Sequence, residues 1–103
     1  MESIGMTFDY KNGVMKAQID SVRGISIEYT NGKETPVQIF RYDSFENSVL
    51  FDVRNAGLEN SDIKSALEKI ARSNIADFPA KDMAAAAYER FRAATENLEE
   101  PIY

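Results

Sequence analysis

The chain has 103 residues, of which 44% are apolar and 28% charged, and its formal net charge is −5. This composition predicts an ordinary globular protein with one domain over residues 1–103. Histidine and cysteine are absent, which excludes disulfides, the usual zinc ligands and the commonest general base. The sequence therefore predicts no enzyme activity, no cofactor and no metal site.

The acidic balance bears on the partners that this chain can bind. Seventeen acidic residues against twelve basic ones disfavour a nucleic-acid backbone, which is bound through lysine and arginine. The same balance favours a protein partner with a basic surface. The N-terminus lacks the features of a signal peptide, and no apolar run approaches the ~20 residues of a membrane span. Together with the lack of cysteine, this predicts a cytoplasmic protein without membrane contact.

A β-hairpin is predicted first, because Asn12-Gly13 is a favoured pair for a two-residue turn. Such a turn also brings polar residues together on the opposite face, where Asp9 meets Lys16. Turn chemistry and the alternation of apolar residues agree on one register. In that register the apolar pairs share one face: Tyr10 with Met15, Phe8 with Ala17, and Met6 with Ile19.

A second hairpin is predicted around Asn31-Gly32. A two-residue loop there pairs apolar with polar residues, so a three-residue loop over 30–32 is favoured, with Gly32 in the left-handed position of a bulge. Ile25 then faces Val37. Pro36 has no N–H to donate and belongs beside solvent or a bulge.

The next two strands complete the predicted sheet. Residues 37–42 are apolar on both faces, with Val37 and Ile39 on one side and Phe40 and Tyr42 on the other. A fifth strand is predicted over 48–54, with Val49 among its inward residues. The prediction is a five-stranded antiparallel meander over residues 6–54.

Helical spacing replaces alternation after residue 57. Ser61 is predicted to cap a helix over about 61–74, and a second helix is predicted over about 79–99, opened by Asp77-Phe78-Pro79 and stopped by Pro101. Each has one apolar stripe, formed by Ile63, Ala66, Leu67, Ile70 and Ala71 in the first and by Met83 or Ala84, Ala87, Tyr88, Phe91, Ala94, Thr95 and Leu98 in the second. A helix hairpin over the sheet gives a two-layer α+β sandwich.

The candidate partner-binding site follows from the strand that is apolar on both faces. A two-layer fold covers only one of those faces, so the other needs a partner. Aromatic residues and arginine are enriched in the hot spots of protein interfaces. The predicted site therefore comprises residues of this strand and of the loop after it: Phe40, Arg41, Tyr42, Phe45 and Glu46.

Three functions stay open on the sequence. The preferred one is a small protein-binding module, such as an inhibitor, an immunity protein or an adaptor. The second is a homodimeric scaffold that pairs through the uncovered sheet face or through the alanine run 84–87. The third is a small-molecule-binding domain with a pocket between sheet and helices, for which the polar groups are Tyr10, Tyr29, Tyr88, Arg41 and Asp52.

Overall fold

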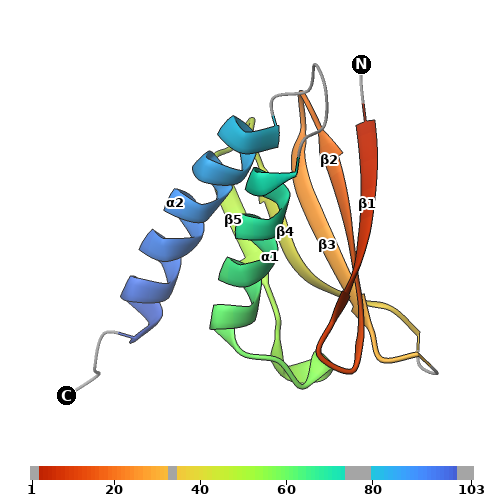
Figure 1. Ribbon diagram of the computed structural model, residues 1–103. Helices are drawn as coiled ribbons and strands as arrows, with labels where there is room; N and C mark the ends of the chain where they lie inside the picture. Colours follow the sequence, from red (N-terminus) through yellow and green to blue (C-terminus); the bar gives the residue numbers. More distant parts are fainter. Residues whose placement is uncertain (1–2, 33–34, 74–79, 100–103) are drawn as a thin grey trace.

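The computed structural model describes residues 3–32, 35–73 and 80–99. A short 3₁₀ helix, η1 (Arg54–Ala56), links the strands to the helices. The other elements follow in chain order (Figure 1): β1 (Ser3–Tyr10), β2 (Gly13–Asp20), β3 (Gly24–Thr30), β4 (Val37–Asp43), β5 (Ser48–Phe51), α1 (Asn60–Arg72) and α2 (Ala80–Glu99).

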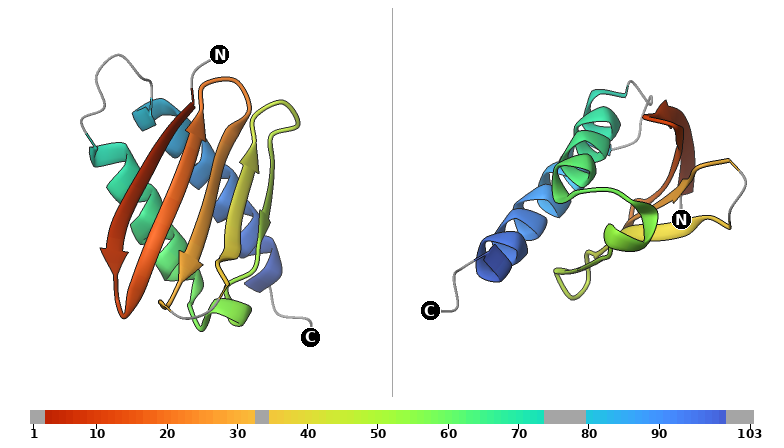
Figure 2. Two further views of the ribbon diagram at one scale, coloured as in Figure 1. Left: turned by 90° about the vertical axis from the view of Figure 1, so that its right-hand side faces the viewer. Right: turned by 90° about the horizontal axis from the view of Figure 1, so that it is seen from below.

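The strands form one antiparallel sheet in the order β1-β2-β3-β4-β5. Both helices lie against the same face of this sheet, and the opposite face is uncovered (Figure 2). The predicted five-stranded meander with a two-helix hairpin in a two-layer α+β arrangement is confirmed. The uncovered face is polar along its centre, where Lys16 and Gln18 are exposed.

The first hairpin exists, but its predicted register is wrong. Lys11 and Asn12 form the loop, Tyr10 pairs with Gly13, and Phe8 faces Met15. The shift of two positions along β2 keeps every apolar residue on the face that the alternation predicts. The positive φ of this turn, 51°, falls on Lys11. Position 13, where β2 begins, requires glycine because a Cβ there would lie 2.2 Å from the Thr30 carbonyl oxygen.

A β-bulge in β4 overturns the prediction of a strand with two apolar faces. Ile27 pairs with Phe40 and Glu28 pairs with Gln38, so Ile39 is an extra residue on β4. A bulge lets two consecutive residues turn away from the alternating pattern. Ile39 and Phe40 are both fully buried in the one core. The apolar residues of β4 are therefore core residues, and no second apolar face remains for a partner.

The predicted three-residue loop of the second hairpin is also wrong. β3 ends at Thr30 and β4 begins at Val37, which pairs with Tyr29 rather than with Ile25. The loop between the strands is longer than predicted, and Pro36 lies in it, exposed and outside the ladder. Gly32 has the expected positive φ, 102°, but in the loop rather than in a bulge.

The helices bury or partly bury the predicted stripes as far as their side chains are described, and the Leu98 side chain lies outside the described ones. In α1 the fully buried residues include Ile63 and Ile70, and in α2 they include Ala84 and Ala87. Phe91 of α2 presents its ring edge-on to two strands, with ring centroids 5.6 Å from Phe40 and 5.0 Å from Phe51. These contacts bind α2 to β4 and β5. No helix among the described residues is long and apolar enough to cross a membrane.

Some element ends differ from the predicted ones. α1 begins at Asn60, with Glu59 rather than Ser61 as its N-cap. β5 ends at Phe51 instead of residue 54, because the chain turns into η1 after the Asp52 N–H donates to the Ile39 carbonyl at 3.0 Å. The predictions for Asn74, for residues 77–79 and for Pro101 lie outside the described residues.

Candidate protein-contact surface

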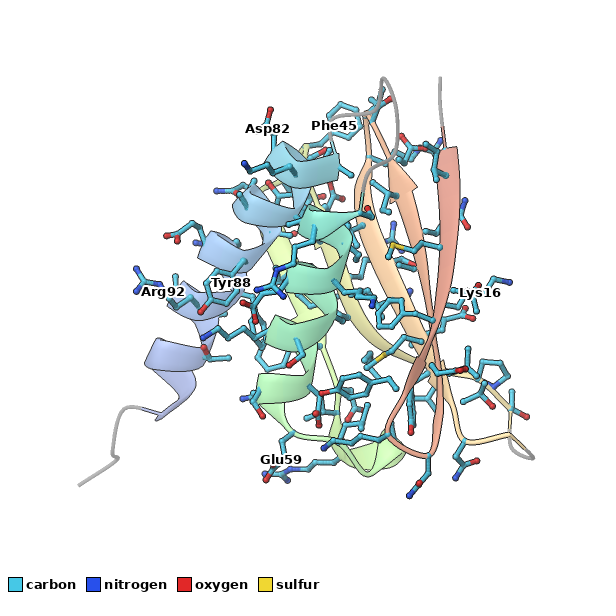
Figure 3. All side chains as sticks on the ribbon, in the orientation of Figure 1. Lys16, Phe45, Glu59, Asp82, Tyr88 and Arg92 are labelled. Carbon is cyan, nitrogen blue, oxygen red and sulfur yellow. The ribbon has the colours of Figure 1, made fainter. Side chains whose placement is uncertain are left out.

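Three large apolar side chains are exposed among the described residues: Val22 at 42%, Phe45 at 73% and Leu50 at 72%. Val22 lies in the β2–β3 turn, Phe45 in the β4–β5 turn and Leu50 on β5. The two turns lie at the same end of the sheet (Figure 2), and Phe45 projects into solvent there (Figure 3). The exposed large apolar residues of the described ranges are thus concentrated in one region of the sheet.

Hydrogen bonds hold the β2–β3 turn and join it to the β4–β5 turn. The Asp20 carboxylate accepts from the backbone N–H groups of Val22 and Arg23 at 2.8 and 2.9 Å. The Ser44 N–H donates to the Arg23 carbonyl at 2.9 Å, and the Ser44 hydroxyl donates to the Val22 carbonyl. Val22 is therefore carried by a turn with a defined conformation.

The turn that carries Phe45 is held in the same way. The Asp43 carboxylate accepts from the N–H groups of Phe45 and Glu46 at 2.9 and 3.3 Å. The Tyr42 hydroxyl donates to the Asn47 side-chain oxygen at 3.2 Å, and Asn47 has a φ of 52°, which asparagine tolerates better than most residues. Because this turn is already ordered, its backbone loses little further conformational entropy when the exposed Phe45 side chain binds a partner.

Two arginines flank these apolar side chains. Arg41 is exposed and pairs with Leu50 across β4 and β5. Arg23 and Arg41 line one shallow hollow of about 240 Å³ on the sheet. Neither guanidinium forms an ion pair with any residue in the described ranges. We call Val22, Arg23, Arg41, Phe45 and Leu50 the hairpin-end surface.

The structure separates the five predicted site residues. Phe40 is fully buried and Tyr42 is 5% exposed, so these two are core residues and are not available to a partner. Arg41, Phe45 and Glu46 are exposed, and Arg41 and Phe45 belong to the hairpin-end surface. Sequence reasoning missed Val22, Arg23 and Leu50. Alternation along the fifth strand gave a usable signal for Leu50, because it placed this residue opposite to the inward-facing set.

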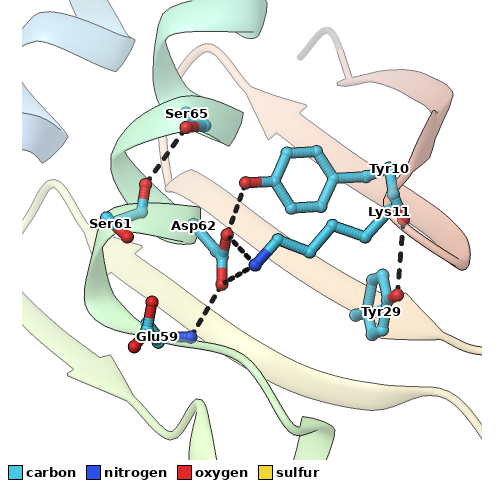
Figure 4. A network of polar contacts seen from close by, with 7 residues as sticks. All are labelled: Tyr10, Lys11, Tyr29, Glu59, Ser61, Asp62 and Ser65. Atoms are coloured by element: carbon cyan, nitrogen blue, oxygen red, sulfur yellow. Dashed lines mark hydrogen bonds and ion pairs between the residues drawn. The ribbon is translucent and has the colours of Figure 1, made fainter.

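A second polar cluster connects the β1–β2 loop to the start of α1 (Figure 4). Asp62 is 2% exposed. Its carboxylate accepts from the Tyr10 hydroxyl at 2.5 Å and from the Glu59 backbone N–H at 2.7 Å, and it forms an ion pair with the Lys11 ammonium at 3.0 Å. The sequence placed Asp62 only within the first turn of the helix predicted over about 61–74. Its burial was not predicted.

The pKa shifts in this cluster follow from these contacts. Burial acts to raise the pKa of Asp62, but the bonds from Tyr10, Glu59 and Lys11 outweigh it and hold the pKa below its ordinary value. Burial, together with the bond to Asp62, raises the pKa of the Tyr10 hydroxyl. The bond to Asp62 raises the pKa of Lys11. The cluster thus keeps its charges at neutral pH and stabilises the contact between the sheet and α1.

The polar residues named for a small-molecule pocket do not share one site. Tyr10 bonds to Asp62, and the Tyr29 hydroxyl donates to the Tyr10 carbonyl at 3.3 Å. Tyr88 lines a groove between α1 and α2, whereas Arg41 lines the hollow on the sheet. Within the described ranges no three acidic residues are grouped so that they could hold a metal ion.

The structure thus defines a small α+β protein with a covered and an uncovered sheet face. The large apolar residues that are exposed in its described part lie near two joined turns. Comparison with protein-family models, with curated proteins and with solved structures finds no match for this chain.

Proposed function

We propose that this protein is a non-catalytic protein-binding module and that the hairpin-end surface is its contact surface. The observation that carries the proposal is the grouping of exposed Val22, Phe45 and Leu50 with two arginines that form no ion pair with the residues the structure describes. Interfaces combine apolar anchors with arginine and exclude water around them. An inhibitor or an adaptor needs no more than such a surface.

The local charge specifies the chemistry of the partner. Arg23 and Arg41 favour a partner that places carboxylates beside an apolar side chain, since guanidinium binds carboxylate in a planar, two-bond geometry. Exposed Glu46 next to Phe45 offers a position for one basic group. The net charge of −5 acts at longer range and favours encounter with a partner of positive overall charge.

Alanine substitution tests this proposal. We expect Phe45→Ala and Leu50→Ala each to weaken binding by about tenfold or more, because anchor residues at the centre of an interface dominate its affinity. Their side chains are mostly in solvent, so the free energy of unfolding should change by no more than about 0.5 kcal/mol. Binding is measured by titration calorimetry with the captured partner, and stability by urea unfolding.

A matched pair of arginine variants provides the control. Arg41→Ala removes a charge from the hairpin-end surface, whereas Arg54→Ala removes an exposed arginine from η1, beyond the end of β5. Only the first is expected to weaken binding. Equal effects of the two substitutions would mean that net charge governs binding, and the assignment of this surface would then be wrong.

A further inference from the structure

Among the described residues, β1 is an edge strand of the sheet with no further strand paired to it. The strand order places β1 and β5 at the two edges, and β1 is eight residues long against four for β5. The pairing of β1 with β2 runs without a shift from Ser3 to Tyr10. Such an edge offers a regular row of backbone donors and acceptors to another strand.

The register shows which backbone groups point outward. Tyr10 and Gly13 flank a two-residue loop, so they form a hydrogen-bonded pair, and the even-numbered residues of β1 share this orientation toward β2. The outward groups therefore belong to alternate residues, all with exposed side chains: Ser3, Gly5, Thr7 and Asp9.

Between Ser3 and Tyr10 the strand itself carries none of the sequence features that usually protect an edge against pairing, apart from one charge. Proteins protect edge strands with proline, lysine, bulges or very short strands. None of these occurs between Ser3 and Tyr10, where Asp9 is the one charged residue. Ile4, Met6 and Phe8 pack against the core but remain only partly buried. An added strand would therefore find both free backbone groups and apolar surface.

We propose that β1 pairs antiparallel with β1 of a second copy of this chain, around a two-fold axis at Met6. In this register Ile4 lies opposite Phe8 of the partner subunit, and Gly5 lies opposite Thr7 of the partner subunit. Asp9 lies opposite Ser3 of the partner subunit, so no like charges face each other. The two sheets then form one continuous sheet with all helices on one side.

The sequence of β1 favours a second copy of this chain as the source of the strand that pairs with this edge. The strand is self-complementary in this register, because apolar residues meet apolar residues on the helix side and small polar residues meet on the other side. A shift of one position would bring the apolar row of one strand opposite the polar row of the other, which fixes the parity of the register. A two-fold interface of this kind closes after two subunits.

Sedimentation equilibrium at micromolar concentration tests the proposal. We expect a mass twice that of the 11.6 kDa chain and a return to the single-chain mass in Thr7→Pro. The Thr7 N–H points away from β2, so proline there removes no bond within the subunit but blocks the added strand. Thr7→Val keeps the N–H and should retain the double mass. A single-chain mass for the unmodified protein would overturn the proposal.

Backbone hydrogen exchange gives a test that needs no substitution. In the dimer the amides of Gly5, Thr7 and Asp9 bond to the partner subunit, so their exchange should slow at least tenfold as the protein concentration rises. Unchanged fast exchange at these amides in a sample of double mass would show that the subunits meet elsewhere. Neither result depends on the hairpin-end surface, since Phe45→Ala should leave the mass and the exchange unchanged.

Discussion

Gly24→Ala is expected to lower the free energy of unfolding by about 3 kcal/mol or more, which is a large fraction of the stability of a small protein. Gly24 has a φ of 131°, and a Cβ there would lie 2.0 Å from the Tyr42 carbonyl oxygen. Backbone strain and collision with a neighbouring strand act together. Urea unfolding followed by circular dichroism measures the loss.

Three other glycines allow the contribution of backbone strain to be distinguished from that of the collision. Gly32 has a φ of 102° with nothing near the position of a Cβ, whereas a Cβ on Gly13 would lie 2.2 Å from the Thr30 carbonyl oxygen without a positive φ. Gly5 has neither problem. We therefore expect alanine at Gly32 to cost about 1 kcal/mol and alanine at Gly5 to cost nothing. A Gly24→Ala variant as stable as Gly5→Ala would contradict the packing of β3 against β4.

The second large effect is expected from Asp62→Asn, with a loss of about 2–3 kcal/mol at neutral pH. The amide is the same size as the carboxylate, but it is neutral, so the ion pair with the Lys11 ammonium is lost. Its NH₂ group replaces one carboxylate oxygen and faces a donor there, either the Tyr10 hydroxyl or the Glu59 N–H. Asp82→Asn is the matched control, because Asp82 occupies the first turn of α2 and is exposed. It should cost only a few tenths of a kcal/mol.

The effect of Asp62→Asn should depend on pH. The pKa of Asp62 is lower in the folded protein than its ordinary value of 3.8, so the unfolded chain takes up this proton first as the pH falls. The contribution of Asp62 is fully present above that value and is lost as the pH falls through the lower, folded pKa. The difference in stability between the two proteins should therefore begin to shrink below about pH 4 and disappear only below the folded pKa. A difference that persists unchanged at lower pH would show that charge is not the cause.

The architecture was predictable because apolar periodicity shows which residues face the core even where the predicted strand register is wrong. The apolar residues of β1 stay on the core side even though the hairpin register is off by two positions, since an even shift preserves the face. The stripes of α1 and α2 depend only on spacing along one helix. Both signals are local and repeat many times.

The predictions that failed depend on contacts between backbone segments of different strands. Asn12-Gly13 resembles a hairpin turn, yet Gly13 is required by the nearby Thr30 carbonyl oxygen, which no local pattern reveals. The bulge at Ile39 likewise depends on the pairing of β4 with β3. Because of this bulge, the apolar residues of β4 belong to one core, although the sequence of this strand indicates two apolar faces.

The candidate site was partly predictable for the same reason. Arg41 and Phe45 were found from residue type and from their place near a loop. Val22 joins them because Ser44 donates to the carbonyls of Val22 and Arg23 in the facing turn, and such a contact between distant turns has no signature in the sequence. Phe40 and Tyr42 were assigned to the site only because the bulge was not foreseen.

The most direct test of the contact surface places a photo-crosslinking phenylalanine analogue at position 45 in the cells that produce the protein. Phe45 is 73% exposed, so the substitution should leave the fold intact. A matched analogue at Arg54, also exposed, serves as the control. We expect one discrete cross-linked protein from position 45, lost when Leu50→Ala is added, and none from position 54. Equal cross-linking from both positions would contradict the hairpin-end surface as the binding site.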